Sequence, residues 1–90
     1  MFNATYQGLK VVPSISATHE MLKHDKSIDD IVDVLEQGYP SPRRRKKGTI
    51  ERWIDRGNKT FNAVIVKDYN AEEKEDVWVL IHFGKFTKRK

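Results

Sequence analysis

The spacing of apolar residues changes from a helical to an extended period near Pro42, and this change divides the 90-residue chain into two kinds of structure. Before Pro42, apolar side chains recur at intervals of three and four residues, as in an amphipathic helix. After it they alternate with other residues, as in β-strands. The chain therefore predicts an α+β domain in which helices precede a sheet.

The helical pattern is clearest between Ser27 and Gly38. Ser27 is a suitable N-cap, and the aspartates at positions 29 and 30 place negative charge in the first turn. Gly38 is expected to end the helix in the left-handed conformation, and Pro40 follows it. The apolar stripe of this helix consists of Ile28, Ile31, Val32 and Leu35. These features predict about three helical turns that cover a sheet.

A shorter helix is predicted before it, from a cap at Ser14 or Ser16 to about residue 24. Its inner stripe is expected to contain Ile15, His19 and Leu22, with Met21 beside it.

Three strands are predicted in the second half of the chain, at residues 49–55, 60–69 and 77–86. A turn at 56–59 and a polar loop at 70–76 connect them, which indicates an antiparallel meander. The last strand is apolar on both faces and is expected in the middle of the sheet or under a helix. Residues 9–12 form a short strand or an extended arm that ends at Pro13. The predicted fold is thus two N-terminal helices packed on a three-stranded antiparallel sheet, with this segment as an optional extra strand.

Length and composition indicate the number of domains, the kinds of site that are excluded and the expected location. We expect one domain over residues 1–90, with an ordered core at about 9–86 and a basic tail at 87–90. The absence of cysteine excludes disulfides and thiolate metal sites, and no other motif predicts a metal ion or cofactor. The N-terminal residues lack the basic start and apolar stretch of a signal peptide, so a cytoplasmic location is expected.

Charge alternates along the chain, although its net value is +4. Residues 43–59 contain eight basic and two acidic side chains, and residues 85–90 contain four basic ones. If these segments meet, they form a positive surface that attracts phosphate backbones. The alternatives are a solvated basic loop and a docking surface for an acidic protein.

Candidate nucleic-acid-binding residues follow from this pattern. Arginine binds phosphate through a planar fork, and Tyr39 could stack on a base. Trp53 is either a core residue or a second stacking platform. The candidates are Tyr39, Arg43, Arg44, Arg45, Lys46, Lys47, Arg56, Lys59 and Lys85.

Metal-independent RNA cleavage would need a base for the 2′-hydroxyl, an acid for the leaving oxygen and cations around the phosphate. His19, Glu51 or His82 could transfer the protons. Lys23, Arg45 and Arg52 could supply positive charge. The candidate catalytic residues are therefore His19, Lys23, Glu51, Arg52 and His82. The other interpretation of His19 and His82 is that both imidazoles are packing residues.

Two segments, 16–23 (SATHEMLK) and 27–38 (SIDDIVDVLEQG), resemble a family of small domains related to the RelE-like and BrnT-like ribonuclease toxins. His19 matches the family histidine, Lys23 stands where the family usually has arginine, and Glu20 replaces a small residue. The resemblance covers about residues 14–86. It implies a RelE-like fold and a toxin that cleaves RNA, including ribosome-bound mRNA, and is neutralised by an acidic antitoxin protein. A non-catalytic nucleic-acid-binding module and a protein-interaction domain are the alternatives.

Overall fold

The computed structural model describes residues 4–42 and 46–87, and 52% of these residues lie in β-strands. Arg43, Arg44, Arg45 and the tail residues 88–90 lie outside the described residues. The elements in chain order are β1 (Thr5–Tyr6), β2 (Leu9–Pro13), α1 (Ile15–Lys23), α2 (Ile28–Gln37), β3 (Tyr39–Pro40), β4 (Thr49–Arg56), β5 (Lys59–Asn70) and β6 (Glu75–Thr87).

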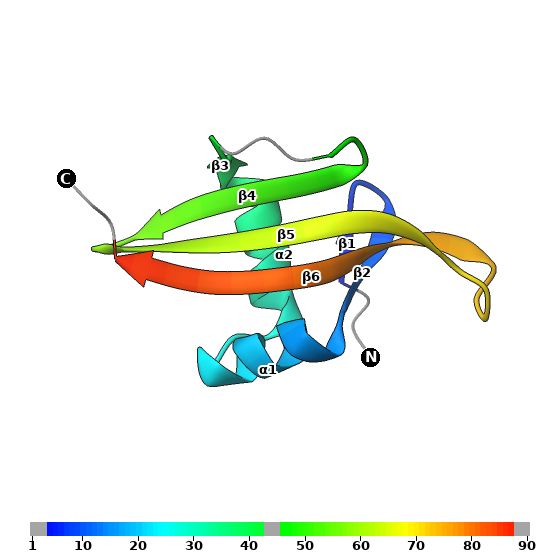
Figure 1. Cartoon of the computed structure of the whole chain (residues 1–90), viewed down its shortest axis with the longest axis horizontal. Helices are drawn as coiled ribbons and strands as arrows, with labels where there is room; N and C mark the ends of the chain where they lie inside the picture. The colour runs from blue at the N-terminus through cyan, green and yellow to red at the C-terminus, as the bar shows by residue number, and fades with distance from the viewer. Residues whose placement is uncertain (1–3, 43–45, 88–90) are drawn as a thin grey trace.

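The six strands form one mixed sheet in the order β1-β2-β6-β5-β4-β3, which curls into a half-barrel (Figure 1). Only β2 and β6 pair in parallel. The prediction of a three-stranded antiparallel sheet under two helices is therefore wrong, as is the RelE-like description attached to it. The β4–β5–β6 meander exists, but β2 adds to its far side and two short strands extend both edges. Strand β6 lies between β2 and β5, which confirms the prediction of a strand in the middle of the sheet.

Local sequence explains where the helices begin. The Ser14 side chain accepts a hydrogen bond from the Ala17 backbone N–H at 3.1 Å and caps α1. Ser27 and Asp30 form a reciprocal capping box at the start of α2. Gly38 ends α2 with φ −74° and ψ 179°, so the expected left-handed conformation is wrong. The glycine is needed for a different reason, which is the close approach of backbone described in the Discussion.

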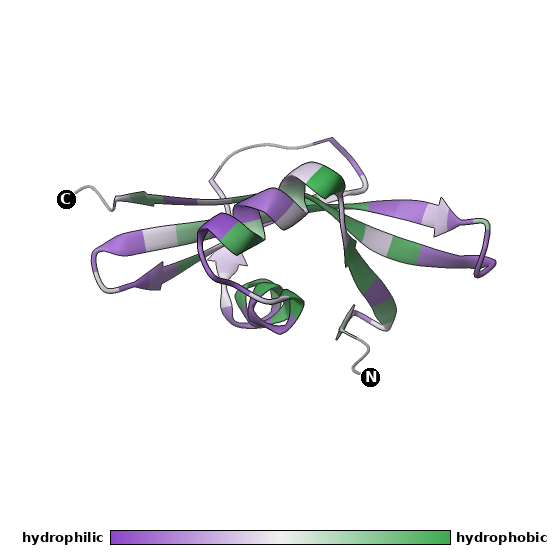
Figure 2. Ribbon diagram, turned by 90° about the horizontal axis from the view of Figure 1, so that it is seen from below, coloured by the Kyte–Doolittle hydropathy of each residue, from purple (hydrophilic) through white to green (hydrophobic). Residues whose placement is uncertain are grey.

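The two helices contact different parts of the sheet. Helix α2 packs on β4 and β5, and Figure 2, which looks along α2, shows it on one side of the sheet. Helix α1 lies along β6 (Figure 1).

The buried stripe of α1 consists of Ala17 and Met21, so the predicted inner stripe is wrong. Ile15 is 81% exposed, and Leu22 and His19 are exposed as well. This nine-residue helix carries apolar residues on more than one side, so the helical period alone could not select the buried side. The packing of α1 along β6 determines which side of the helix is buried.

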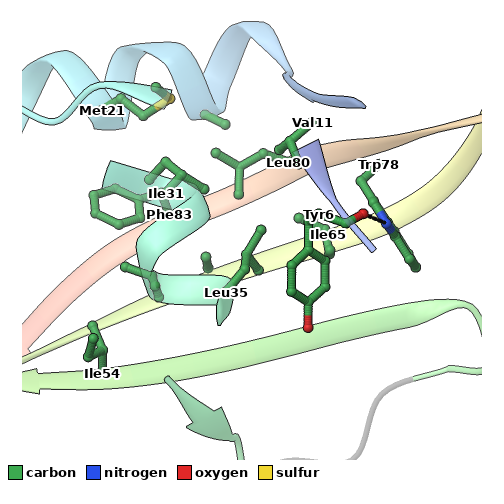
Figure 3. Close-up of a cluster of buried hydrophobic side chains, with 13 residues drawn as sticks. Tyr6, Val11, Met21, Ile31, Leu35, Ile54, Ile65, Trp78, Leu80 and Phe83 are labelled. Atoms are coloured by element: carbon green, nitrogen blue, oxygen red, sulfur yellow. Dashed lines mark hydrogen bonds between the residues drawn. The ribbon is translucent and has the colours of Figure 1, made fainter. Parts of the chain in front are cut away.

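The hydrophobic core lies between the helices and the inner face of the sheet (Figure 3). Ile31 and Leu35 of α2 are fully buried there, together with Ile65 and Leu80 of the sheet. Trp78 extends the core toward β1, where its indole N–H donates to the Tyr6 carbonyl oxygen at 3.0 Å. This packing places α1 beside the part of the β6 edge that β2 does not cover, and the site described next lies there.

Candidate functional site

A pocket of about 300 Å³ lies between the C-terminal half of α1 and the C-terminal half of β6; we call it the α1–β6 pocket. Helix α1 and its cap contribute an acid, a lysine and an imidazole, and the sheet contributes polar, basic and aromatic groups. The lining residues are Glu20, Lys23, His24, Asn62, His82, Gly84, Lys85 and Phe86.

The pairing of β6 explains why the pocket forms at this place. β2 pairs only with residues 77–80 of β6, so the rest of that edge is left for α1. A bulge near Ile81 shifts the register, and beyond it His82 lies opposite Val64 and Gly84 lies opposite Asn62. The neighbouring Phe83 points into the core under the helices. By strand alternation, His82 and Gly84 occupy the face away from the helices.

Gly84 lets two polar side chains approach the backbone of β6 in this pocket. A Cβ atom at position 84 would lie 2.8 Å from Asn62 Oδ1 and 3.0 Å from His82 Nε2. Both atoms therefore lie over the Cα atom of Gly84, and a larger residue there would displace the ends of these two side chains.

The orientation of Asn62 is fixed by a buried carboxylate on the neighbouring strand. Glu51 of β4 is 5% exposed, and its Oε2 accepts hydrogen bonds from Trp53 Nε1 at 2.8 Å and Asn62 Nδ2 at 3.2 Å. Because the amide nitrogen of Asn62 faces Glu51, the amide oxygen faces Gly84.

His24 forms the other side of the pocket. Its half-buried ring meets the buried ring of Phe83 edge-on, with the ring centroids 5.9 Å apart. Burial lowers the pKa of His24, and the nearby Lys85 cation lowers it further. Nε2 lies 3.9 Å from the Glu20 carboxylate, which acts in the opposite direction. The net effect favours the neutral imidazole in the folded protein.

This imidazole is expected to make stability depend on pH. Because the pKa of His24 is lower in the folded state than its ordinary value of 6.5, the unfolded state binds more protons in mildly acidic solution. The stability that the neutral ring contributes is complete above about pH 6.5 and is lost as the pH falls through the folded-state pKa. Melting temperatures measured from pH 8 to pH 5.5 should fall more steeply for the wild type than for His24→Gln. Equal slopes for the two proteins would contradict the prediction.

The structure brings together some of the predicted catalytic residues and separates others. Lys23 and His82 line the α1–β6 pocket, and Glu51 reaches it through Asn62. His82 is exposed, so its interpretation as a packing residue is wrong. His19 is exposed on α1 and is not a lining residue.

Arg52 is directed away from the pocket. It lies opposite Ala63, on the helix-facing side of β4, and its Nη2 donates to the Gly38 carbonyl oxygen at 2.5 Å. This hydrogen bond connects β4 to the end of α2. Arg52 and Glu51 are consecutive in the strand and therefore occupy opposite faces of the sheet.

An aromatic row crosses the face away from the helices and ends at the pocket. The rings of Tyr39 and Trp53 meet edge-on with centroids 6.4 Å apart, and those of Trp53 and Phe86 at 5.0 Å. Trp53 is half-buried and lies outside the core cluster under the helices. The Tyr39 hydroxyl donates to Asp55 Oδ1 at 3.0 Å; desolvation and this carboxylate raise the pKa of Tyr39.

The other predicted binding residues are spread over the molecule. Lys85 lines the α1–β6 pocket, whereas Lys59 donates to Thr87 Oγ1 at 2.9 Å near the β4–β5 turn. Arg56 is exposed and lines a second pocket of about 190 Å³ against α2. Lys46 and Lys47 are exposed before β4.

Sequence reasoning missed five residues of the pocket: Glu20, His24, Asn62, Gly84 and Phe86. His24 stands three positions after the buried Met21, so a helix phased on Ala17 and Met21 would have pointed to it. Asn62 is a polar residue within an otherwise apolar strand, which is a signal for a hydrogen-bonded network. Gly84 carried no signal, because its importance depends on the strand register.

Within residues 4–42 and 46–87, no three histidine or acidic side chains come together in a way that could hold a metal ion. No helix in the same ranges has both the length and the apolar character needed to cross a membrane. Comparison with protein-family models, with curated proteins and with solved structures gives no match for the chain. The geometry of the α1–β6 pocket and the aromatic row beside it is therefore the basis for assigning a function.

Proposed function

We propose that the protein binds single-stranded RNA across the aromatic row, with a backbone phosphate in the α1–β6 pocket. The observation that carries this proposal is the presence of Lys23 and Lys85, from different elements, around one pocket that also contains two imidazoles. Two lysines that line one pocket suit a phosphate, because its oxygens accept several hydrogen bonds at once.

The aromatic row supports a single strand as the ligand. Phe86 lies at the pocket and is 36% exposed, and Tyr39 at the far end of the row is 42% exposed. Unpaired bases stack on such rings, whereas the bases of a duplex are already stacked on one another. An acidic peptide could also bind the two lysines, but its carboxylates would make no contact that requires the aromatic row.

A second candidate function, metal-independent RNA cleavage, is favoured by the two imidazoles. One would take the proton from a ribose 2′-hydroxyl as its oxygen attacks phosphorus, and the other would protonate the departing 5′ oxygen. The products would be a 2′,3′-cyclic phosphate and a 5′-hydroxyl. The neutral imidazole is favoured at His24, so His24 suits the role of the base that accepts the 2′-hydroxyl proton. His82 would supply the proton to the departing oxygen. The resemblance to ribonuclease toxins implied RNA cleavage and an acidic antitoxin partner, but its histidine, His19, does not line this pocket.

Removal of either pocket lysine is expected to weaken RNA binding about tenfold to a hundredfold, since a hydrogen bond to a charged group contributes roughly 1.5–3 kcal/mol. Lys23→Ala and Lys85→Ala would be titrated with a short labelled RNA by fluorescence anisotropy at two salt concentrations. Lys67→Ala is the matched control, because it removes the same charge from an exposed position of β5 outside the pocket. Wild-type binding should weaken steeply with salt.

The same samples, resolved on a denaturing gel with a chelator present, test the second candidate. Cleavage by the wild type and not by His82→Ala would support it, and intact RNA would leave a binding module. Failure of the wild type to bind RNA at low salt would overturn the proposed function and favour an acidic protein partner. Equal losses in the Lys67→Ala control would show a general charge effect and would contradict the assignment of the pocket.

A further inference from the structure

We infer that a second pocket of the protein binds a free α-amino acid with an apolar side chain. This pocket of about 190 Å³ lies where the first two turns of α2 face the sheet, and we call it the α2–β4 pocket. It shares no lining residue with the α1–β6 pocket, so the inference is independent of RNA binding. The lining residues are Lys26, Asp30, Asp33, Val34, Ile54, Arg56, Phe61 and Phe83.

The floor of the α2–β4 pocket is apolar. Val34, Ile54 and Phe83 are buried members of the hydrophobic core, and Figure 3 shows Ile54 and Phe83 on the side of the sheet that faces α2. Phe61 is half-buried, lies opposite Ile54 in the β4–β5 pairing and stacks on Phe83. An apolar group that enters the pocket is therefore removed from water against aliphatic and aromatic side chains.

The volume of the pocket limits the size of its ligand. Pockets for drug-sized molecules have volumes of roughly 300–1,000 Å³, and the α2–β4 pocket is smaller than this range. It suits a molecule of the size of a single amino acid.

The rim of the pocket carries charges of both signs. Lys26 and Arg56 are cations, and Asp30 and Asp33 are carboxylates. Among the residues that the structure describes, none of these four forms an ion pair. The Arg56 guanidinium donates only to the backbone carbonyl oxygen of the preceding residue, at 3.3 Å. All four charges are thus available to a ligand.

Lys26 and Asp30 are the pair best placed to hold the charged groups of the ligand. Lys26 Nζ lies over the ring of Phe61, 5.0 Å from its centroid, which keeps the ammonium beside the apolar floor. Ser27 donates two hydrogen bonds to Asp30 Oδ2, at 2.8 Å from its backbone N–H and 3.1 Å from its hydroxyl. Asp30 Oδ1 accepts none from the described part of the chain, so it can accept one from a ligand.

The charge state of Asp30 suits an ammonium ligand. The hydrogen bonds from Ser27 lower the pKa of Asp30, and the nearby Lys26 cation lowers it further. The carboxylate is therefore ionised at neutral pH, with a cation near it that does not pair with it. The α-ammonium and α-carboxylate of an amino acid are attached to one carbon atom, so a single molecule can bind both side chains at once.

Opposite charges around one apolar floor select against other small ligands. A phosphate or nucleotide would be repelled by Asp30 and Asp33, and a polyamine would be repelled by Lys26 and Arg56. A residue within a peptide chain carries neither terminal charge. A free amino acid with an apolar side chain uses the cations, the carboxylates and the floor together.

The test is isothermal titration calorimetry of the wild-type protein with L-phenylalanine and L-leucine, which should bind with a Kd of about 1 mM or tighter. N-acetyl-L-phenylalanine lacks the ammonium and L-phenylalaninamide lacks the carboxylate. Each should bind about tenfold more weakly or worse, because one charged hydrogen bond is lost. Glycine should also bind at least about tenfold more weakly, because it buries no side chain.

Asp30→Asn and Lys26→Gln provide the second arm of the test. Each should weaken binding of L-phenylalanine about tenfold or more. Asp29→Asn is the matched control for the first variant, because it removes the same charge from the neighbouring, exposed position of the same helix turn. Circular dichroism would confirm the fold of each variant, and the wild-type ligand series decides the question if a variant does not fold.

Failure of the wild type to bind either amino acid at up to about 10 mM would overturn the inference and leave RNA binding untouched. Equal affinity for L-phenylalanine and its N-acetyl or amide derivative would also overturn it. An equal loss in Asp29→Asn and Asp30→Asn would do the same, since it would show a general effect of charge on α2.

Discussion

Gly38→Ala is expected to destabilise the protein by about 3 kcal/mol, at the upper end of the usual cost of overpacking. A Cβ atom at this position would lie within 3.0 Å of two carbonyl oxygens, those of Val34 and Trp53. Both belong to the backbone, one in α2 and one in β4, so neither can rotate away as a side chain could. The Gly38 carbonyl also accepts the hydrogen bond from Arg52, and displacement would weaken that connection.

Urea denaturation followed by circular dichroism would measure this loss. Gln37→Ala is the matched control, because it changes the preceding, exposed residue and should alter the free energy of unfolding by less than about 0.5 kcal/mol. A loss below about 1 kcal/mol in Gly38→Ala would contradict the close packing of the end of α2 against β4.

Phe83→Ala is expected to cost about 3–5 kcal/mol, the range for removal of a buried aromatic ring. Phe83 is 1% exposed and stacks on Phe61 with ring centroids 5.8 Å apart. Its other neighbour is His24, whose ring meets it edge-on. The variant therefore loses core packing and the support of one wall of the α1–β6 pocket, so RNA binding should weaken along with stability.

Phe86→Ala separates stability from binding, because it removes the same ring from the same strand at a partly exposed position. Its free energy of unfolding should change by less than about 1 kcal/mol, since it loses mainly the edge contact with Trp53. RNA affinity should fall in this variant despite the intact fold, because a stacking platform is lost. Similar denaturation curves for Phe83→Ala and Phe86→Ala would show that the core assignment of Phe83 is wrong.

The alternation of side chains along each strand correctly predicted which face of the sheet a residue occupies. Which residues lie side by side depends on the register between strands, and the sequence could not predict that. The alternation in residues 49–55 already placed Glu51 and Arg52 on opposite faces, and the structure has them there. Residue type alone nevertheless put both in one catalytic set. Lys23 and His82 line the same pocket, although 58 residues separate them in the chain, and no local pattern could reveal this. The charge pattern predicted Lys85 as a binding residue but could not place it beside His24.

The sequence by itself determined the local elements. Ser27 and Asp30 define the start of α2, and alternation defines β4, β5 and β6 to within about two residues of their observed ends. These features depend on neighbours within a few positions, which the sequence displays directly.

Tertiary structure alone decided the parallel pairing of β2 with β6, the buried side of α1 and the close approach of Asn62 and His82 to Gly84. Each depends on contacts between residues far apart in the chain. The free energy of such contacts comes from burying surfaces that several alternative partners could cover equally well, so spacing along the chain does not specify them.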